Sequence, residues 1–154
     1  MKVVVTGGAG FIGSHVVDAC LDAGHDVVVV DDLSTGKRHN VNPGARLHVA
    51  NICDTDALDA FFAAERPEAI CHLAAKANVR ESMIEPLLYA QINVLGSLSL
   101  LEMSRRWGCR KFVYASTGGA VYGEPQYLPV DEKHPIDPLD PYGASKHHVE
   151  HYLS

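Results

Sequence analysis

A run of valines followed at once by three evenly spaced glycines constrains the fold of this chain more than any other feature. Residues 3–5 are valines, and Gly7, Gly10 and Gly13 follow in the spacing G-x-x-G-x-x-G, after which a helical pattern begins. The valines predict a buried strand, and the glycines predict a tight turn where a phosphate can approach a helix N-terminus. We therefore expect a dinucleotide site at the start of the chain.

Strand and helix patterns alternate along the rest of the sequence, which is typical of βαβ units in a parallel sheet. Strands are expected at residues 2–6, 26–30, 46–50, 69–73 and 111–115. Helices are expected at residues 11–23, 54–66, 86–107 and 142–154, with loops at 31–44 and 116–140. The predicted fold is a Rossmann-type, doubly wound α/β sheet of strand order 3-2-1-4-5. A final helix of this kind should lead to another strand, so either the fold closes with five strands or this stretch is the front part of a longer protein. We favour the second interpretation and expect the last strands and a C-terminal substrate domain to be missing.

Composition excludes several other classes of protein. The formal charge of -6 argues against nucleic-acid binding, which needs a basic face. The N-terminal apolar run is too short for a signal peptide, and no apolar run is long enough to span a membrane. The four cysteines are scattered without a C-x-x-C pair, so we expect reduced thiols in a cytoplasmic protein.

A carboxylate at the end of the second predicted strand indicates which dinucleotide is bound. Asp31 lies close to the position about twenty residues beyond the glycines where an acid binds the adenosine ribose. Such a carboxylate repels a 2′-phosphate, which favours NAD over NADP. The alternative, in which Asp31 and Asp32 are a solvated turn pair, is less favoured. Residues 33–38, which follow, fit contact with the cofactor phosphates and exposure to water equally well.

A second group of residues indicates proton transfer. Tyr142 and Lys146 are four residues apart in the last predicted helix and so share one face. An ammonium beside a phenol stabilises the phenolate, which can act as a general base toward a sugar hydroxyl. Ser116 and Thr117 directly follow the fifth strand, which places their hydroxyls at the carboxyl end of the sheet, where α/β folds bind ligands.

Together these stretches resemble the extended short-chain dehydrogenase/reductase family, in its NAD-dependent epimerase/dehydratase branch. The motifs that carry the resemblance are TGGAGFIGSH, VVVVDDLSTGK, HLAAKANVRES, the N-x-x-G of residues 93–96, YASTGGAVYGE and PYGASK. The likeness is greatest to the UDP-hexose 4-epimerases of this branch. It implies that residues 1–154 are an incomplete NAD-binding Rossmann domain, the N-terminal part of a longer enzyme that is a homodimer.

The resemblance also implies a set of cofactor contacts. Amides at Phe11 and Ile12 would hold the pyrophosphate, and Asn93 would support the catalytic loop. Where relatives use an Asp-Ile pair against adenine, this chain has Asn51 and Ile52, which puts that contact in doubt. The cofactor positions implied are Gly7, Gly10, Phe11, Ile12, Gly13, Asp31, Asp32, Leu33, Ser34, Thr35, Gly36, Asn51, Ile52, Leu73, Ala74, Ala75, Asn93, Tyr142 and Lys146.

The implied reaction is 4-epimerisation of UDP-glucose or UDP-galactose. Tyr142 would take the proton from the sugar O4 while hydride passes from C4 to NAD, and Thr117 would bridge Tyr142 and the substrate. Lys76 is a further candidate substrate contact, although a structural ion pair is an equal alternative. The acidic pair that dehydratase relatives carry after this threonine is absent, since Gly118 and Gly119 follow it.

Other activities within the branch remain open, because the residues that select the sugar normally lie beyond this stretch. The alternatives are an epimerase of UDP-glucuronate or UDP-N-acetylhexosamine, another sugar-nucleotide oxidoreductase, or a nucleotide-binding fragment without turnover. His147 and His151 have helical spacing that suits one metal ion, but with no acidic partner apparent we expect a polar helix face and no metal.

Overall fold

The structure, a computed structural model, describes residues 1–154 and divides them into two compact units. Unit 1 comprises Met1–Ala75 and Gly96–Ala115. Unit 2 comprises Lys76–Leu95 and Ser116–Ser154. The two units are described separately below.

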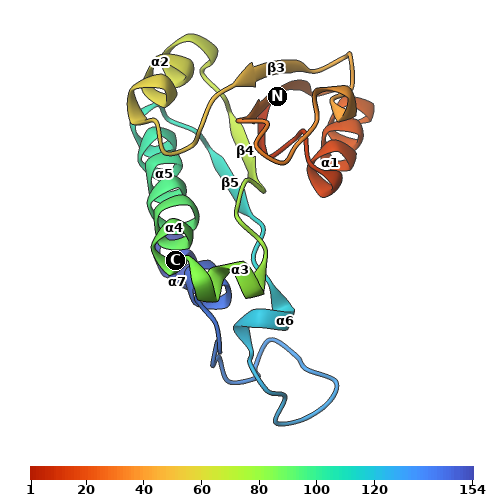
Figure 1. Ribbon diagram of the computed structural model, residues 1–154. Coiled ribbons are helices and arrows are strands. Elements are labelled where there is room, and N and C mark those ends of the chain that lie inside the picture. Colours follow the sequence, from red (N-terminus) through yellow and green to blue (C-terminus); the bar gives the residue numbers. More distant parts are fainter. The chain divides into compact units, whose positions relative to one another are not determined.

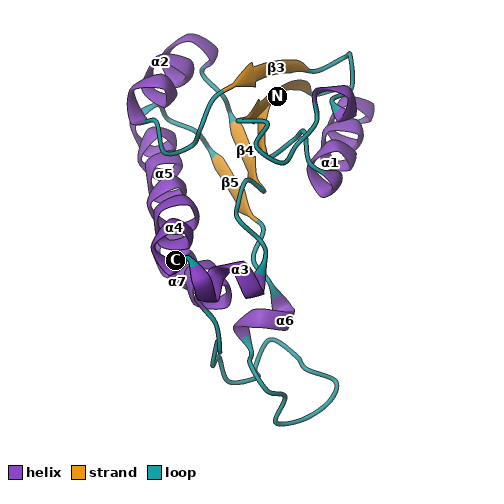
Figure 2. Ribbon diagram, viewed as in Figure 1, coloured by secondary structure: helices purple, strands orange, loops and turns teal.

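Unit 1 contains a five-stranded parallel sheet of order β3-β2-β1-β4-β5, which confirms the predicted topology. Figure 2 shows these strands as orange arrows. Each predicted strand is present, with ends within one residue of those expected. The strands are β1 (Lys2–Thr6), β2 (Asp26–Asp31), β3 (Arg46–Val49), β4 (Ala69–His72) and β5 (Lys111–Tyr114).

The core of unit 1 lies where the valines of β1 and β2 pair. Val4 pairs with Val28 and Val5 with Val29, and all four side chains are buried. Continuous apolar strands are expected where helices cover both faces of a parallel sheet. Figure 1 shows α1 on one face of the sheet and α2 and α5 together on the other. These helices are α1 (Phe11–Asp22), α2 (Thr55–Glu65) and α5 (Ser97–Arg106).

Unit 2 is helical, and α7 is the element against which its other helices pack. Contacts join α7 to α3, α4 and α6. The N-cap of α7 is Asp140, whose side chain accepts a hydrogen bond from the Gly143 N–H at 2.8 Å, and Pro141 occupies the first helical position. The helices of this unit are α3 (Val79–Ile84), α4 (Pro86–Tyr89), α6 (Gly118–Val121) and α7 (Pro141–Leu153).

Three helical details differ from the sequence prediction. The single helix expected at 86–107 is α4, then the π-helical segment η2 (Ala90–Gly96), then α5, because apolar periodicity does not detect an extra residue per turn. The short helix α3 was missed because its six residues are too few to show apolar periodicity, although Asn78 caps it by accepting from the Glu81 N–H at 3.1 Å. Two short turns, α6 and the 3-10 helix η1 (Arg38–Asn40), lie in segments expected to be loops.

All four cysteines are free thiols, as expected. None of the helices combines the length and hydrophobicity that a membrane crossing requires.

Candidate functional site

The glycine turn of unit 1 has no space for larger residues. Gly7 has φ +71°, and a Cβ there would lie 2.7 Å from the backbone nitrogen of Ala74. A Cβ on Gly13 would lie 2.1 Å from the carbonyl oxygen of Gly7. Glycine at position 7 lets the turn approach the backbone of Ala74, and glycine at position 13 lets the helix approach the backbone of Gly7. The sequence predicted such close approach where the strand turns into the helix.

The N-terminus of α1 is open to an anion. Its N-cap is Gly10, which has no side chain to satisfy the first N–H groups, and its first turn carries no acidic residue. These N–H groups have no carbonyl partner within the helix, and they lie at the positive end of its dipole. The predicted pyrophosphate contacts, Phe11 and Ile12, are the first two residues of this helix, and their side chains are exposed.

Asp31 connects the glycine turn to the loop that follows β2. Its Oδ2 accepts from the Ala9 N–H at 3.0 Å, and its Oδ1 accepts from the Leu33 N–H at 2.8 Å. The Ala9 carbonyl in turn accepts from the Lys37 N–H and the Asn40 side chain, each at 2.9 Å. A carboxylate offers about four acceptor positions. Two hydrogen bonds therefore leave Asp31 able to accept from two ribose hydroxyls.

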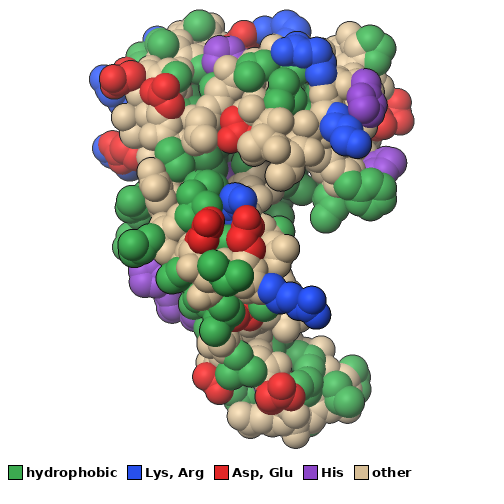
Figure 3. Space-filling model, in the orientation of Figure 1, with side chains coloured by type: hydrophobic (Ala, Val, Ile, Leu, Met, Phe, Trp, Pro, Cys, Tyr) green, Lys and Arg blue, Asp and Glu red, His purple; other side chains and the backbone are tan.

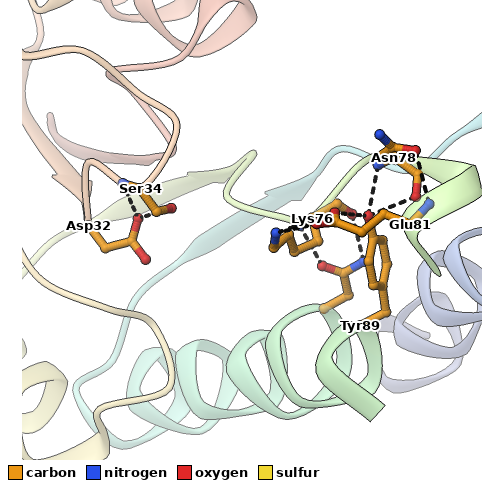
Figure 4. Close-up of polar contacts among 7 residues, drawn as sticks. Asp32, Ser34, Lys76, Asn78, Glu81 and Tyr89 are labelled. Atoms are coloured by element: carbon orange, nitrogen blue, oxygen red, sulfur yellow. Dashed lines mark hydrogen bonds and ion pairs between the residues drawn. The ribbon is translucent and has the colours of Figure 1, made fainter. Parts of the chain in front are cut away.

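The turn after β2 is held in a left-handed conformation. Leu33 has φ +59°, which is unusual for a residue with a branched side chain, and strain of this kind clusters at functional sites. Asp32 accepts from the Ser34 N–H at 2.9 Å and from its hydroxyl at 2.6 Å, as Figure 4 shows. Gly36 lies against Asp31, because a Cβ there would be 2.9 Å from Oδ1. Thr35 is exposed.

Asn51 and Ile52 occupy different environments. The Asn51 amide donates to Asp32 Oδ2 at 3.1 Å, and its oxygen accepts from the Cys53 N–H at 2.8 Å. Asn51 thus links the turn after β3 to the turn after β2. Ile52 is buried, and its side chain fills the space beside Gly96. Of the pair, only Asn51 is exposed.

The residues predicted to face the nicotinamide lie directly after β4. Leu73 continues the sheet through a hydrogen bond from its N–H to the Thr6 carbonyl at 3.1 Å. Ala74 lies against Gly7, as the crowding at that glycine shows. Leu73, Ala74 and Ala75 are all partly exposed, so this strand end and the glycine turn meet at the carboxyl edge of the sheet.

In unit 2, Tyr142 and Lys146 lie one turn apart on α7. Lys146 is only 4% exposed, and this burial lowers the pKa of its ammonium to about 8, an effect that the carboxylate of Glu150 partly opposes. Tyr142 is partly exposed. The helix thus carries a phenol that solvent can reach one turn from a buried lysine; the Y-x-x-x-K spacing predicted the helix and the spacing of the two residues, but not the burial of Lys146.

Asn93 joins α7 to the segment that precedes α3. Its Oδ1 accepts from the Lys76 N–H at 2.8 Å, and its Nδ2 donates to the Lys76 carbonyl at 2.9 Å and to Ser145 Oγ at 3.0 Å. The Ser145 hydroxyl donates onward to the Tyr142 carbonyl at 2.7 Å. Buried Asn93 therefore fixes the backbone on either side of the site.

The side chain of Lys76 belongs to a closed polar cluster, shown in Figure 4. Its ammonium lies 3.1 Å from Glu81 Oε1. Glu81 also lies 2.8 Å from the hydroxyl of Tyr89, which accepts from the Asn78 N–H at 3.0 Å. Burial and the neighbouring carboxylate raise the pKa of Tyr89 to about 12. Of the two interpretations that the sequence allowed for Lys76, the structure shows the ion pair.

Thr117 is the N-cap of α6, and α6 packs on α7. A Cβ on Gly143 would lie 2.5 Å from the carbonyl oxygen of Ala120, so glycine at this position lets α6 come close beside Tyr142. The hydroxyl of the neighbouring Ser116 donates to the Glu150 carboxylate. Ser116 is thus engaged with α7 through Glu150, while Thr117 lies at the start of the helix that packs on α7.

The histidines of α7 have an acidic partner, which corrects the expectation that none was near. His147 Nδ1 lies 2.9 Å from Glu150 Oε2, and His147 Nε2 lies 3.1 Å from His151 Nε2. The partner was missed because it depends on side-chain rotamers. Figure 3 shows histidine side chains gathered over α7. No group of three or more His, Cys, Asp or Glu side chains is arranged to hold a metal ion.

Sequence reasoning did not single out Ser145, Gly143, Glu81 or Tyr89. Gly143 and Ser145 lie inside the PYGASK motif, between Tyr142 and Lys146, so the motif could have marked them as candidate site residues. Glu81 lies inside the HLAAKANVRES motif, but Tyr89 carries no such signal, because its contacts bring together α3, α4 and the segment before them.

Known proteins match this chain over nearly all of its length. Residues 3–154 match the NAD dependent epimerase/dehydratase family. A UDP-glucose 4-epimerase of Thermotoga maritima, solved with UDP-glucose, has TM-score 0.97 and 46% identity over 99% of this chain and 50% of its own. The UDP-glucose 4-epimerase of Thermus thermophilus, solved with NAD, has TM-score 0.96 and 47% identity over 99% of this chain and 50% of its own.

A UDP-glucose 4-epimerase of Lacticaseibacillus casei is 46% identical over 146 residues, which cover 95% of this chain and 44% of the relative. The chain spans about half the length of the curated relatives it matches. With its parallel sheet, its glycine turn and its Tyr142–Lys146 helix, the chain belongs to the NAD dependent epimerase/dehydratase family.

Proposed function

We propose that this chain is the NAD-binding part of a longer enzyme that interconverts UDP-glucose and UDP-galactose at C4. The observation that carries the proposal is the buried Lys146 one helical turn from the partly exposed Tyr142. Relatives of the same family support it, since the Thermotoga protein was solved with UDP-glucose and the Thermus protein with NAD.

The residues of unit 1 fit NAD. The uncapped N-terminus of α1 suits a pyrophosphate, and the crowding at Gly7 and Gly13 keeps the turn free of side chains. The spare acceptor capacity of Asp31 suits the adenosine ribose, and its negative charge disfavours a 2′-phosphate. Leu73, Ala74 and Ala75 offer a small apolar surface for the nicotinamide half. When bound, NAD supplies the acceptor and donor of hydride.

Unit 2 supplies the proton transfer. Tyr142 takes the proton from the O4 hydroxyl of the sugar and later returns it. The ammonium of Lys146, one helical turn away, would favour the phenolate form of Tyr142. Thr117 positions the O4 hydroxyl against Tyr142, while Asn93 and Ser145 hold the backbone of α7 in place.

Asn51 is assigned to the adenine end of the cofactor. An amide both donates and accepts hydrogen bonds, so asparagine in place of the aspartate of relatives keeps the capacity to recognise adenine. Its hydrogen bond to Asp32 orients it at the turn beside Asp31. The ammonium of Lys76 is already paired with Glu81, so we do not assign it to the substrate. Any contact between Lys76 and the substrate would come from its backbone.

We further propose that the full-length enzyme is a cytoplasmic homodimer. The four free thiols support a reducing compartment. The family resemblance supports the dimer. Gel filtration with light scattering on the full-length protein tests this: a dimer mass supports the proposal, and a monomer mass at working concentration rejects it.

The main test is an assay of the full-length protein with UDP-galactose and no added cofactor. Because hydride leaves and returns within each turnover, bound NAD is regenerated, and UDP-glucose should form with many turnovers per bound NAD. Parallel assays with UDP-glucuronate and UDP-N-acetylglucosamine test the alternatives. Conversion of one of these without conversion of UDP-galactose would reassign the substrate.

A further inference from the structure

Three buried polar side chains in unit 1 lie behind the proposed cofactor surface and form one hydrogen-bonded chain. Thr6 ends β1, His72 ends β4 and Ser97 begins α5, and their exposures are 0%, 1% and 1%. Thr6 Oγ1 lies 2.6 Å from His72 Nδ1, and His72 Nε2 lies 2.7 Å from Ser97 Oγ. The chain therefore joins two strands and a helix.

The hydrogen bonds at Thr6 connect this chain to the backbone that follows β4. Thr6 Oγ1 accepts from the Leu73 and Ala74 N–H groups, each at 3.2 Å. The Leu73 N–H is shared with the Thr6 carbonyl, which lies 3.1 Å from it. Each ring nitrogen of His72 lies within hydrogen-bond distance of a hydroxyl, so the ring links Thr6 to Ser97 in either neutral tautomer.

The imidazole is also held by its packing. The rings of Phe112 and Tyr114 on β5 lie against it, with centroids 5.8 Å and 5.6 Å from that of His72. A buried ring held on both nitrogens and by two aromatic neighbours has one orientation. Through Thr6, that orientation extends to the backbone of Leu73 and Ala74.

We propose that Thr6, His72 and Ser97 are positioning residues that hold the β4 end against the glycine turn and so shape the surface for the nicotinamide half of the cofactor. Gly7 and Ala74 are in close backbone contact, so a small shift of the Ala74 backbone would either clash with the glycine turn or open a gap beside it. The proposal rests on the proposed function only in its assignment of NAD to this surface. None of the three side chains touches the cofactor; they act through the backbone of Leu73 and Ala74.

The test compares Thr6→Val with Thr6→Ser in the full-length protein freed of cofactor, by calorimetric titration with NAD and with ADP. Valine keeps the shape of threonine but leaves the Ala74 N–H and His72 Nδ1 without their partner, so the β4 end loses its fixed position. NAD affinity should fall about tenfold, as expected if the competent arrangement is populated about a tenth of the time. ADP, which lacks the nicotinamide half, should bind within about twofold of the original protein.

Thr6→Ser keeps the hydroxyl and should restore NAD binding to within about twofold. Equal weakening of NAD and ADP by Thr6→Val would show a general defect of unit 1 and overturn the proposal, as would unchanged NAD affinity. If Thr6→Val does not fold, Ser97→Ala removes the other end of the chain and should show the same selective loss of NAD. Failure of the original protein to bind NAD at all would instead reject the proposed function.

Discussion

The candidate site residues of unit 1 act mainly through backbone groups, whereas those of unit 2 act mainly through side chains. In unit 1 the site is mainly backbone: an uncapped helix end, glycines in contact with neighbouring backbone, and one carboxylate. In unit 2 the site is a set of side chains held by other side chains, with Asn93 and Ser145 behind Tyr142 and with Glu81 beside Lys76. Unit 1 thus suits a constant ligand, while unit 2 sets the position and charge of reacting groups.

This difference predicts different sensitivities to mutation. The backbone site should fail through steric crowding and should tolerate few changes at its glycines. The side-chain site should fail gradually, through lost hydrogen bonds and shifted protonation, while the fold survives.

The largest effect is expected for Gly13→Ala. The new Cβ would lie 2.1 Å from the Gly7 carbonyl oxygen and 2.8 Å from Gly8 Cα, and these are backbone atoms, which cannot move aside as a flexible side chain can. We expect a loss of about 3 kcal/mol or more in the free energy of unfolding, and no measurable NAD binding. Chemical denaturation measures the free energy of unfolding, and titration measures NAD binding. The matched control is Gly119→Ala, where a Cβ meets open space, and NAD binding should be unchanged. Equal behaviour of the two variants would contradict the account of the turn.

Asp31→Ala should lower the affinity for NAD by about 10-fold to 100-fold, because it removes a charged acceptor of the ribose hydroxyls. The affinity for NADP should fall much less, because alanine does not repel the 2′-phosphate. Titration of both cofactors measures the ratio. The variant also removes the partners of the Ala9 and Leu33 N–H groups, and asparagine could accept from only one of them, so chemical denaturation of Asp31→Ala serves as the control for folding. If both affinities stay unchanged in Asp31→Ala, Asp31 is not in the site.

Tyr89→Phe should act on the stability of unit 2. The phenylalanine leaves the part-buried Asn78 N–H without its acceptor and Glu81 without the hydroxyl. We expect a loss of about 1–3 kcal/mol in the free energy of unfolding, with NAD affinity unchanged. The matched control, Tyr127→Phe, removes an exposed hydroxyl that contacts Asp131 and should have little effect. A loss of NAD binding in Tyr89→Phe would show that the cluster serves unit 1 as well.

The smallest effect is expected for Glu150→Gln, which should move the alkaline limb of activity. Burial lowers the pKa of Lys146 to about 8, so the ammonium that supports the phenolate is lost as the pH rises through that value. The Glu150 carboxylate favours the ammonium, so its removal lowers the pKa of Lys146 further, and activity should decline at lower pH. Glu124→Gln, at an exposed site, should leave the profile unchanged. A limb that moves to higher pH in Glu150→Gln would contradict this role.

The sequence predicted unit 1 better than unit 2 for a physical reason. Strands, a glycine turn and the place of Asp31 depend on local spacing, so valine runs and the G-x-x-G-x-x-G pattern were enough to indicate them, and the strand order followed from the Rossmann-type fold that they predicted. The hydrogen-bonded chain through His72 was not predictable, because it joins positions 25 and 66 residues apart that meet only in the folded sheet.

In unit 2 the helix that carries Tyr142 and Lys146 was predictable from the sequence, but the contacts that hold this helix in place were not. Ser145 lies 52 residues from Asn93, and the crowding at Gly143 involves the carbonyl of Ala120 on another helix. The acidic partner of His147 lies only three residues along the same helix, yet no pattern distinguishes it from an ordinary exposed glutamate. Such contacts depend on tertiary packing and side-chain rotamers, which periodicity does not describe.

The central claim is that unit 1 holds the cofactor while Tyr142 of unit 2 performs the proton transfer. The most direct measurement compares the full-length protein with its Tyr142→Phe variant, recording in one sample the bound NAD, the absorbance of reduced nicotinamide after UDP-galactose is added, and the UDP-glucose formed. We predict equal NAD content in the two proteins, with transient reduction and product in the original protein and neither in the variant. Product formation by the variant at the original rate would contradict the account.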